Sequence, residues 1–195
     1  PHRAQVWNAI NNLGNISMQR ADYALAIAYY DEAIAICEKL NHREGLVIFL
    51  NNRAIAEREQ GLYASAKGFY ERALALSEEL GYVMYNFNIR LHMATNELYH
   101  LHVVDADRIA RQALKVAEQA GNDAWVLFCE GLRLQIAIAR GEAVPPETFI
   151  GLAEALTGHA EHADAAMMRL LAARRFLAAS SPEAARAQLL QALTT

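Results

Sequence analysis

Features that mark several common classes of protein are scarce in this sequence. Its 195 residues include only 4 Pro, 10 Gly and 2 Cys. So little Pro and Gly argues against a disordered or all-β chain. The two cysteines, Cys37 and Cys129, are too few for a disulfide framework, and we interpret them as small buried hydrophobic residues in a reducing setting. The formal net charge of −4 predicts no bulk attraction to nucleic acid or to an anionic membrane.

Signatures of catalysis and of membrane insertion are absent from the sequence as well. No apolar run approaches the length of a membrane span. We find no Gly-rich phosphate loop and no Ser-His-Asp or Cys-His order with a family signature. The sequence therefore predicts a cytoplasmic protein that is not an enzyme and has no cofactor.

A repeat with a period of forty residues is the main positive feature. The residue pattern from Ala21 to Ile36 recurs from Gly61 to Leu76. Ala26, Tyr30 and Ala33 recur at this spacing as Ala66, Tyr70 and Ala73. One more step of forty leads to Ala106, Ala110 and Ala113, where alanine replaces the tyrosine. A fixed period in this range indicates a stacked repeat array. At 54 % apolar residues, the chain can bury a continuous core along such an array.

The apolar periodicity and the turn signals divide the chain into five helical hairpins. The expected repeats, which together make one solenoid over residues 1–195, are residues 3–40, 43–81, 82–121, 122–158 and 161–195. Ten helices and no strand are expected. Asp22 is the predicted N-cap of a second helix, and Pro146 makes the second helix of the fourth repeat begin late.

Helix contact in the first repeat is predicted from residue size. Gly14 allows a second helix to approach closely, and Tyr30 fills the gap between small alanines. Along the first helix, Ile10, Leu13 and Ile16 form an apolar stripe expected to face inward. Leu25 on the second helix is expected to face inward too.

With Leu13-Gly14 on a first helix and Ala26, Tyr30 and Ala33 on a second, the chain resembles the tetratricopeptide repeat family. The forty-residue period is similar to the longer subtype found in kinesin light chains and in bacterial signalling ATPases and transcription activators. The resemblance implies an all-α, right-handed superhelical solenoid whose concave face is lined by the first helix of each hairpin. In many relatives that groove holds an extended peptide.

Polar side chains on the first helices are the candidate binding residues. An amide both donates and accepts, which suits contact with a peptide backbone and favours a binding role for these residues. The alternative is that they are solvated surface positions. Farther along the groove the lining becomes apolar, either as a docking floor or as a surface covered by a neighbouring helix. The candidate groove residues are Asn8, Asn11, Asn12, Asn15, Asn52, Asn88, His92, Phe128, Leu132 and Gln135.

Charge distinguishes this groove from that of the family's chaperone-binding members, which hold a terminal carboxylate with two Asn and several cations. Asn15 and Asn52 match the two amides, but Asn11, Asn88 and His92 stand where the cations would be. The sequence therefore does not predict a chaperone adaptor.

Two histidine pairs have spacings that could hold a metal ion. His159 and His162 lie one helical turn apart, and His100 and His102 straddle a turn. With no third ligand of matching spacing, no metal is expected.

The sequence thus favours a non-catalytic protein–protein interaction module that binds an extended partner segment in its concave groove. We expect it to belong to a larger bacterial signalling or regulatory protein. The alternative is a ligand- or peptide-sensing regulatory domain of a transcription activator or signalling ATPase. The expected partner is a protein or peptide, not nucleic acid or membrane, and self-association is left open.

Overall fold

The computed structural model describes residues 2–179 and 181–194, apart from the side chains of residues 2–6, 8, 163 and 177. These residues form ten α-helices and no strand, so the predicted all-α repeat fold is confirmed. The helices are α1 (His2–Gln19), α2 (Tyr23–Lys39), α3 (Arg43–Glu59), α4 (Tyr63–Glu79), α5 (Val83–Tyr99), α6 (Val103–Ala120), α7 (Asp123–Ala139), α8 (Pro146–Gly158), α9 (His162–Ala178) and α10 (Pro182–Thr194).

A left-handed residue follows most of these helices at a spacing of twenty. After such a residue the chain reverses, which closes the helix and satisfies its last carbonyl groups. The positive-φ residues are Ala21, Asn41, Gly61, Gly81, Leu101, Gly121, Gly141 and Ala160. Helices of about 17 residues separated by such turns give two turns per hairpin, which is the physical origin of the forty-residue period.

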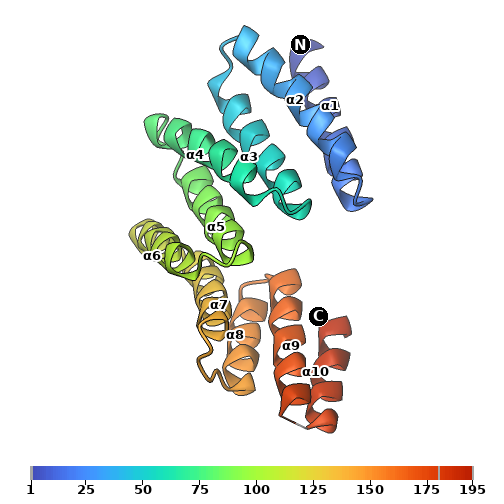
Figure 1. The fold of residues 1–195 in the computed structure, drawn as a ribbon, viewed down its shortest axis with the longest axis vertical. Helices are drawn as coiled ribbons and strands as arrows, with labels where there is room; N and C mark the ends of the chain where they lie inside the picture. The colour runs from blue at the N-terminus through green and yellow to red at the C-terminus, as the bar shows by residue number, and fades with distance from the viewer. Residues whose placement is uncertain (1, 180, 195) are drawn as a thin grey trace. The chain divides into compact units, whose positions relative to one another are not determined.

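The chain divides into two compact units, residues 1–109 and 110–195. In the first unit, each helix from α1 to α5 packs against the next, and α3 also contacts α5 (Figure 1). In the second unit, α7 packs on α8, α8 on α9 and α9 on α10. Both units are therefore stacked helical hairpins. The assignment of residues 1–195 to one continuous array of five repeats stays a prediction.

Close helix approach in the first unit depends on the smallest side chains. Tyr30 and Tyr70 are 1 % and 0 % exposed, and Ala26 and Ala66 are fully buried. A Cβ atom at position 14 would lie 2.8 Å from Cζ of Tyr30, well inside normal contact. Gly14 is therefore required for α2 to lie this close to α1, as the sequence predicted.

Helix ends also follow the local sequence. Asp22 caps α2 by accepting from the backbone N–H of Leu25 at 3.2 Å. Helix α8 begins at Pro146 and has 13 residues, shorter than its neighbours. Both features were predicted from the sequence.

The predicted inward stripe on the first hairpin is wrong in part. Ile10 is buried, but Leu13 and Ile16 are each 44 % exposed, and Leu25 is 43 % exposed. Among the described helices of the first unit, α1 has its main contact with α2 alone. A helix packed on one side buries only a narrow stripe, so the outer apolar residues of this stripe remain exposed.

Candidate functional site

A row of polar side chains crosses the first helices of the hairpins in the first unit. Nδ2 of Asn52 on α3 donates to Oδ1 of Asn11 on α1 at 3.1 Å. Nδ2 of Asn51 lies 3.5 Å from Oδ1 of Asn52, and Oδ1 of Asn51 lies 3.0 Å from Nδ1 of His92 on α5. An amide oxygen only accepts, so Nδ1 of His92 carries the hydrogen. We call these four residues the amide row.

The amide row is uncharged at neutral pH. Desolvation, together with the nearby positive charge of Arg58, lowers the pKa of His92 to about 4. His92 is therefore a neutral imidazole in the folded protein. A ligand held here would meet hydrogen-bonding groups and no formal charge from the row itself.

The remaining candidate residues of the first unit have different environments. Asn15 is exposed, but its Oδ1 accepts from the hydroxyl of Tyr30 at 2.9 Å. Asn12 is exposed and Asn88 is half-buried, and neither has a side-chain hydrogen bond to another residue that the structure describes. The side chain of Asn8 lies outside the described residues. Asn12 and Asn88 thus use none of their hydrogen-bonding capacity on other residues that the structure describes.

One member of the amide row, Asn51, was missed in the sequence analysis. Asn51 lies one forty-residue step beyond Asn11, so the repeat itself carried the signal. The contacts in the row join residues 41 positions apart, as in Asn11 with Asn52 and Asn51 with His92. The forty-residue period therefore predicts which helix face is polar. The hydrogen bonds themselves join each residue to the one after its repeat equivalent.

The apolar candidates in the second unit are covered by the chain's own helices. Leu132 is only 5 % exposed, so its assignment to an open groove floor is wrong. Phe128 is half-buried and packs against the core formed by α8 and α9. Gln135 is half-buried. Of the two alternatives for this surface, coverage by neighbouring helices describes Leu132 and Phe128.

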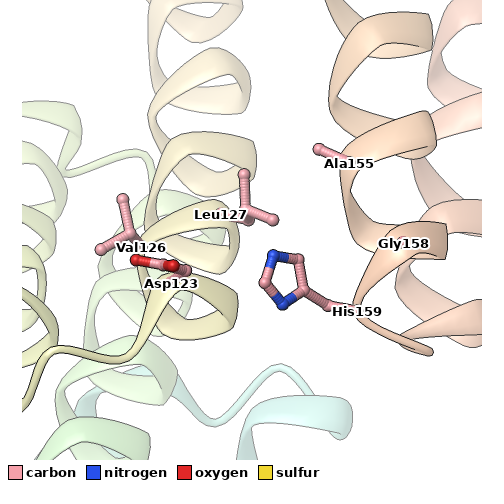
Figure 2. Close-up of a pocket in the computed structure, with 6 residues that line it drawn as sticks. All are labelled: Asp123, Val126, Leu127, Ala155, Gly158 and His159. Carbon is pink, nitrogen blue, oxygen red and sulfur yellow. The ribbon is translucent and has the colours of Figure 1, made fainter.

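The second unit contains an open pocket of about 430 Å³ between α7 and α8. Figure 2 shows Leu127 of α7 directed toward Ala155 of α8 and toward His159 just beyond that helix, and Asp123 and Val126 of α7 also line the pocket. A carboxylate, an imidazole and apolar side chains thus line one cavity. Its volume is near the lower end of the range for small-molecule sites, and it can accept a side chain of a partner.

The described structure places neither cysteine as a reactive nucleophile, and it adds no third ligand to His159 and His162. Both cysteines are buried free thiols. Burial raises the pKa of Cys129 to about 12, so this thiol is not a nucleophile at neutral pH. His159 and His162 are exposed, and no third metal ligand joins them among the described residues. No described helix combines the length and apolar character needed to cross a membrane.

The stacked hairpins and the polar row across their first helices define the class: a helical-repeat interaction module. Residues 3–79 match the model of the family described as tetratricopeptide repeat. Residues 3–79 are therefore tetratricopeptide repeats, and the resemblance seen in the sequence is confirmed over this part of the chain.

Solved structures show the same fold at low sequence identity. Aspartyl phosphate phosphatase F from Bacillus subtilis is similar with a TM-score of 0.76 and 15 % identity, over 96 % of this chain and 48 % of that one. The chain thus spans about half the length of that protein. A kinesin light chain-type protein of Podosopora anserina, with nearly identical TPR-like repeats, has a TM-score of 0.60 and 13 % identity, over 96 % of this chain and 93 % of that one. No curated protein matches the sequence.

Proposed function

We propose that the first unit binds an extended segment of a partner protein across α1, α3 and α5, along the amide row. The observation that carries the proposal is the juxtaposition of hydrogen-bonding side chains from three successive hairpins on one face. Asn11 comes from α1, Asn52 from α3 and His92 from α5. An extended backbone presents N–H and C=O groups in alternation, and such a row offers both kinds of partner.

Hydrogen-bonding capacity remains after the row's internal contacts are made. A carboxamide has two N–H donors and two oxygen lone pairs, and Asn52 uses only part of this set within the row. Asn12 and Asn88 use none of theirs with other described residues. These two side chains can therefore bind a ligand without breaking a hydrogen bond to another described residue.

Polar contacts alone would give only modest affinity. Each net hydrogen bond contributes about 0.5–1.5 kcal/mol. Ile48 and Ile55, which the forty-residue step relates to Asn8 and Asn15, are half-buried on α3 and offer apolar contact beside the row. Because the row is uncharged, binding through it should depend only weakly on salt.

The parent protein belongs, in this proposal, to a bacterial signalling or regulatory system. Support comes from the fold likeness to the aspartyl phosphate phosphatase of Bacillus subtilis, a protein about twice as long as this chain. The role proposed for this chain is binding rather than chemistry. A sensing role would instead predict a change in compactness on ligand addition, visible by small-angle X-ray scattering.

The test begins with a partner identified by pull-down and mapped to a synthetic peptide. The triple change Asn12→Ala, Asn52→Ala and Asn88→Ala should weaken binding of that peptide at least about tenfold, since three hydrogen bonds are lost. Glu71→Ala, on the exposed face of α4, is the matched control and should leave binding unchanged. Unchanged affinity in the triple variant would exclude this face as the site.

A further inference from the structure

Three side chains that bind metals in other proteins meet where α5 turns into α6. Glu97 is in the last turn of α5, and His100 and His102 flank Leu101 in the turn. Each offers one ligand atom, and these atoms all lie within 4.8 Å of one another. We call these three residues the turn cluster.

The turn cluster combines a buried carboxylate with two imidazoles that are more accessible to solvent. The side chain of Glu97 is 2 % exposed, whereas that of His102 is 50 % exposed. The His100 and His102 rings have centroids 4.1 Å apart. The carboxylate is thus shielded from water, His100 is half-buried, and His102 is open to an ion from solvent.

Two basic groups contact the buried carboxylate. Oε2 of Glu97 lies 2.9 Å from Nδ1 of His102, and Oε1 lies 3.2 Å from Nζ of Lys67 on α4. A buried carboxylate is costly unless positive charge or hydrogen bonds compensate it. Lys67 and His102 provide this compensation for the Glu97 carboxylate.

Backbone hydrogen bonds hold the cluster in place. The N–H of His102 donates to the carbonyl oxygen of Glu97 at 2.8 Å, and the N–H of Leu101 donates to that of Leu98 at 3.1 Å. Leu101 has a φ of +64°, a conformation that turns the chain sharply and brings His102 back over the helix end. The ligands are therefore arranged by the turn rather than by free side-chain motion.

We propose that the turn cluster binds a divalent transition-metal ion of the Zn²⁺ class through Glu97, His100 and His102. Imidazole nitrogen and carboxylate oxygen are ligands of this ion, with bonds of roughly 2.0–2.2 Å that place adjacent tetrahedral ligands roughly 3.3 Å apart. Oε2 of Glu97 and Nδ1 of His102 lie 2.9 Å apart through a hydrogen bond, and a small widening would admit the ion in place of the hydrogen, which passes to Nε2 of His102 or to water. Three protein ligands leave a fourth position for water or for a carboxylate from a bound partner.

The positive charge of Lys67 would compete with the metal ion for Glu97, and Lys67 can move away from that carboxylate. Its side chain is 42 % exposed, so its ammonium group can move into water when an ion takes over Glu97. Asp105, in the first turn of α6, also lies within electrostatic reach of Lys67 and His102. The alternative is a purely structural role, in which the contacts of Glu97 with Lys67 and His102 stabilise the turn.

The test uses the untagged chain after treatment with a chelator, with Zn²⁺ alone as the probe. Isothermal titration calorimetry should show one Zn²⁺ bound by the parent, and thermal melting should show a rise in Tm with Zn²⁺. His100→Ala, His102→Ala together should weaken this binding at least about tenfold. His159→Ala, His162→Ala is the matched control, since it removes an exposed histidine pair outside the turn cluster and should retain the parent's affinity.

A second variant distinguishes metal binding from a purely structural role in stabilising the turn. Lys67→Met should strengthen Zn²⁺ binding, because it removes the cation that competes for Oε1 of Glu97. Circular dichroism without metal checks that each variant remains helical. The proposal is overturned if the parent takes up no Zn²⁺, or if the His100 and His102 double variant binds it as tightly as the parent.

Discussion

The hydroxyl of Tyr30 donates a hydrogen bond to Oδ1 of Asn15 at 2.9 Å, whereas its repeat equivalent, the hydroxyl of Tyr70, has none. Both rings are buried. The forty-residue step from Asn15 leads to Ile55, which has no acceptor to offer. One substitution between repeats thus accounts for the buried Tyr70 hydroxyl with no partner among the described residues.

Removing the two hydroxyl groups should have different effects. Tyr30→Phe should lower the free energy of unfolding by about 0.5–1.5 kcal/mol, because it deletes a hydrogen bond and leaves Asn15 without its donor. Tyr70→Phe should be neutral or stabilising, since it deletes a buried polar atom that has no partner. Urea titration of both variants measures the difference. Equal losses would contradict the assignment.

The second prediction concerns Gly14, whose missing side chain leaves space for the ring of Tyr30. Gly14→Ala should destabilise the protein by about 1–3 kcal/mol, because the added methyl group would collide with the tyrosine ring. Gly68→Ala is the matched control. Gly68 lies within α4, and nothing surrounds its Cβ position within 4 Å. There the same change should stabilise by up to about 1 kcal/mol, through helix propensity alone. Similar effects in thermal melting would show that Gly14 has no packing role.

Sequence reasoning succeeded where the repeat and local chemistry determine the structure. The forty-residue period, the Asp22 cap and the contact of Gly14 with Tyr30 all follow from residues close together or one repeat apart. It failed for Leu132, because the period predicts a helix face but not which neighbouring helix covers that face. It also missed Glu97 beside His102. That contact depends on a left-handed turn at Leu101, a conformation that leucine rarely adopts and that its sequence did not signal.

The lowered pKa of His92 predicts a specific loss of stability in acid. The pKa of His92 is about 4 in the folded protein against an ordinary value of 6.5 for histidine, so between these values the unfolded chain binds the proton more readily. The contribution of neutral His92 is complete above pH 6.5 and is lost as the pH falls toward 4. The whole difference is up to about 3 kcal/mol.

His92→Gln isolates this contribution from the carboxylates that titrate in the same range. The variant should lose less stability than the parent between pH 6.5 and pH 4, as measured by urea titration at several pH values. His159→Gln, at an exposed position, serves as the control and should follow the parent. A parallel pH profile for parent and His92→Gln would mean that His92 can be protonated in the folded state.

Arg53 of α3 joins three helices of the first unit. Its guanidinium group pairs with Asp31 of α2 and with Glu57 one turn along α3, and it lies 3.9 Å from the ring centroid of Phe69 on α4. Ser65 also donates to Glu57, at 2.9 Å. The side chain of Glu57 is only 5 % exposed. A largely buried acid thus depends on Arg53 for compensation of its charge.

Arg53→Ala should therefore be severely destabilising, by about 3–5 kcal/mol, because the buried charge of Glu57 then lacks a compensating cation. Adding Glu57→Gln should recover part of the loss, since the neutral amide needs no cation and can still accept from Ser65. Arg72→Ala is the matched control. Its pair with Glu38 is exposed on both sides, at 53 % and 49 %, and should contribute less than about 1 kcal/mol. Denaturant titration of the two single variants and the double variant gives the coupling energy. A double variant that loses the full sum of the single losses would show that Arg53 and Glu57 stabilise the fold independently.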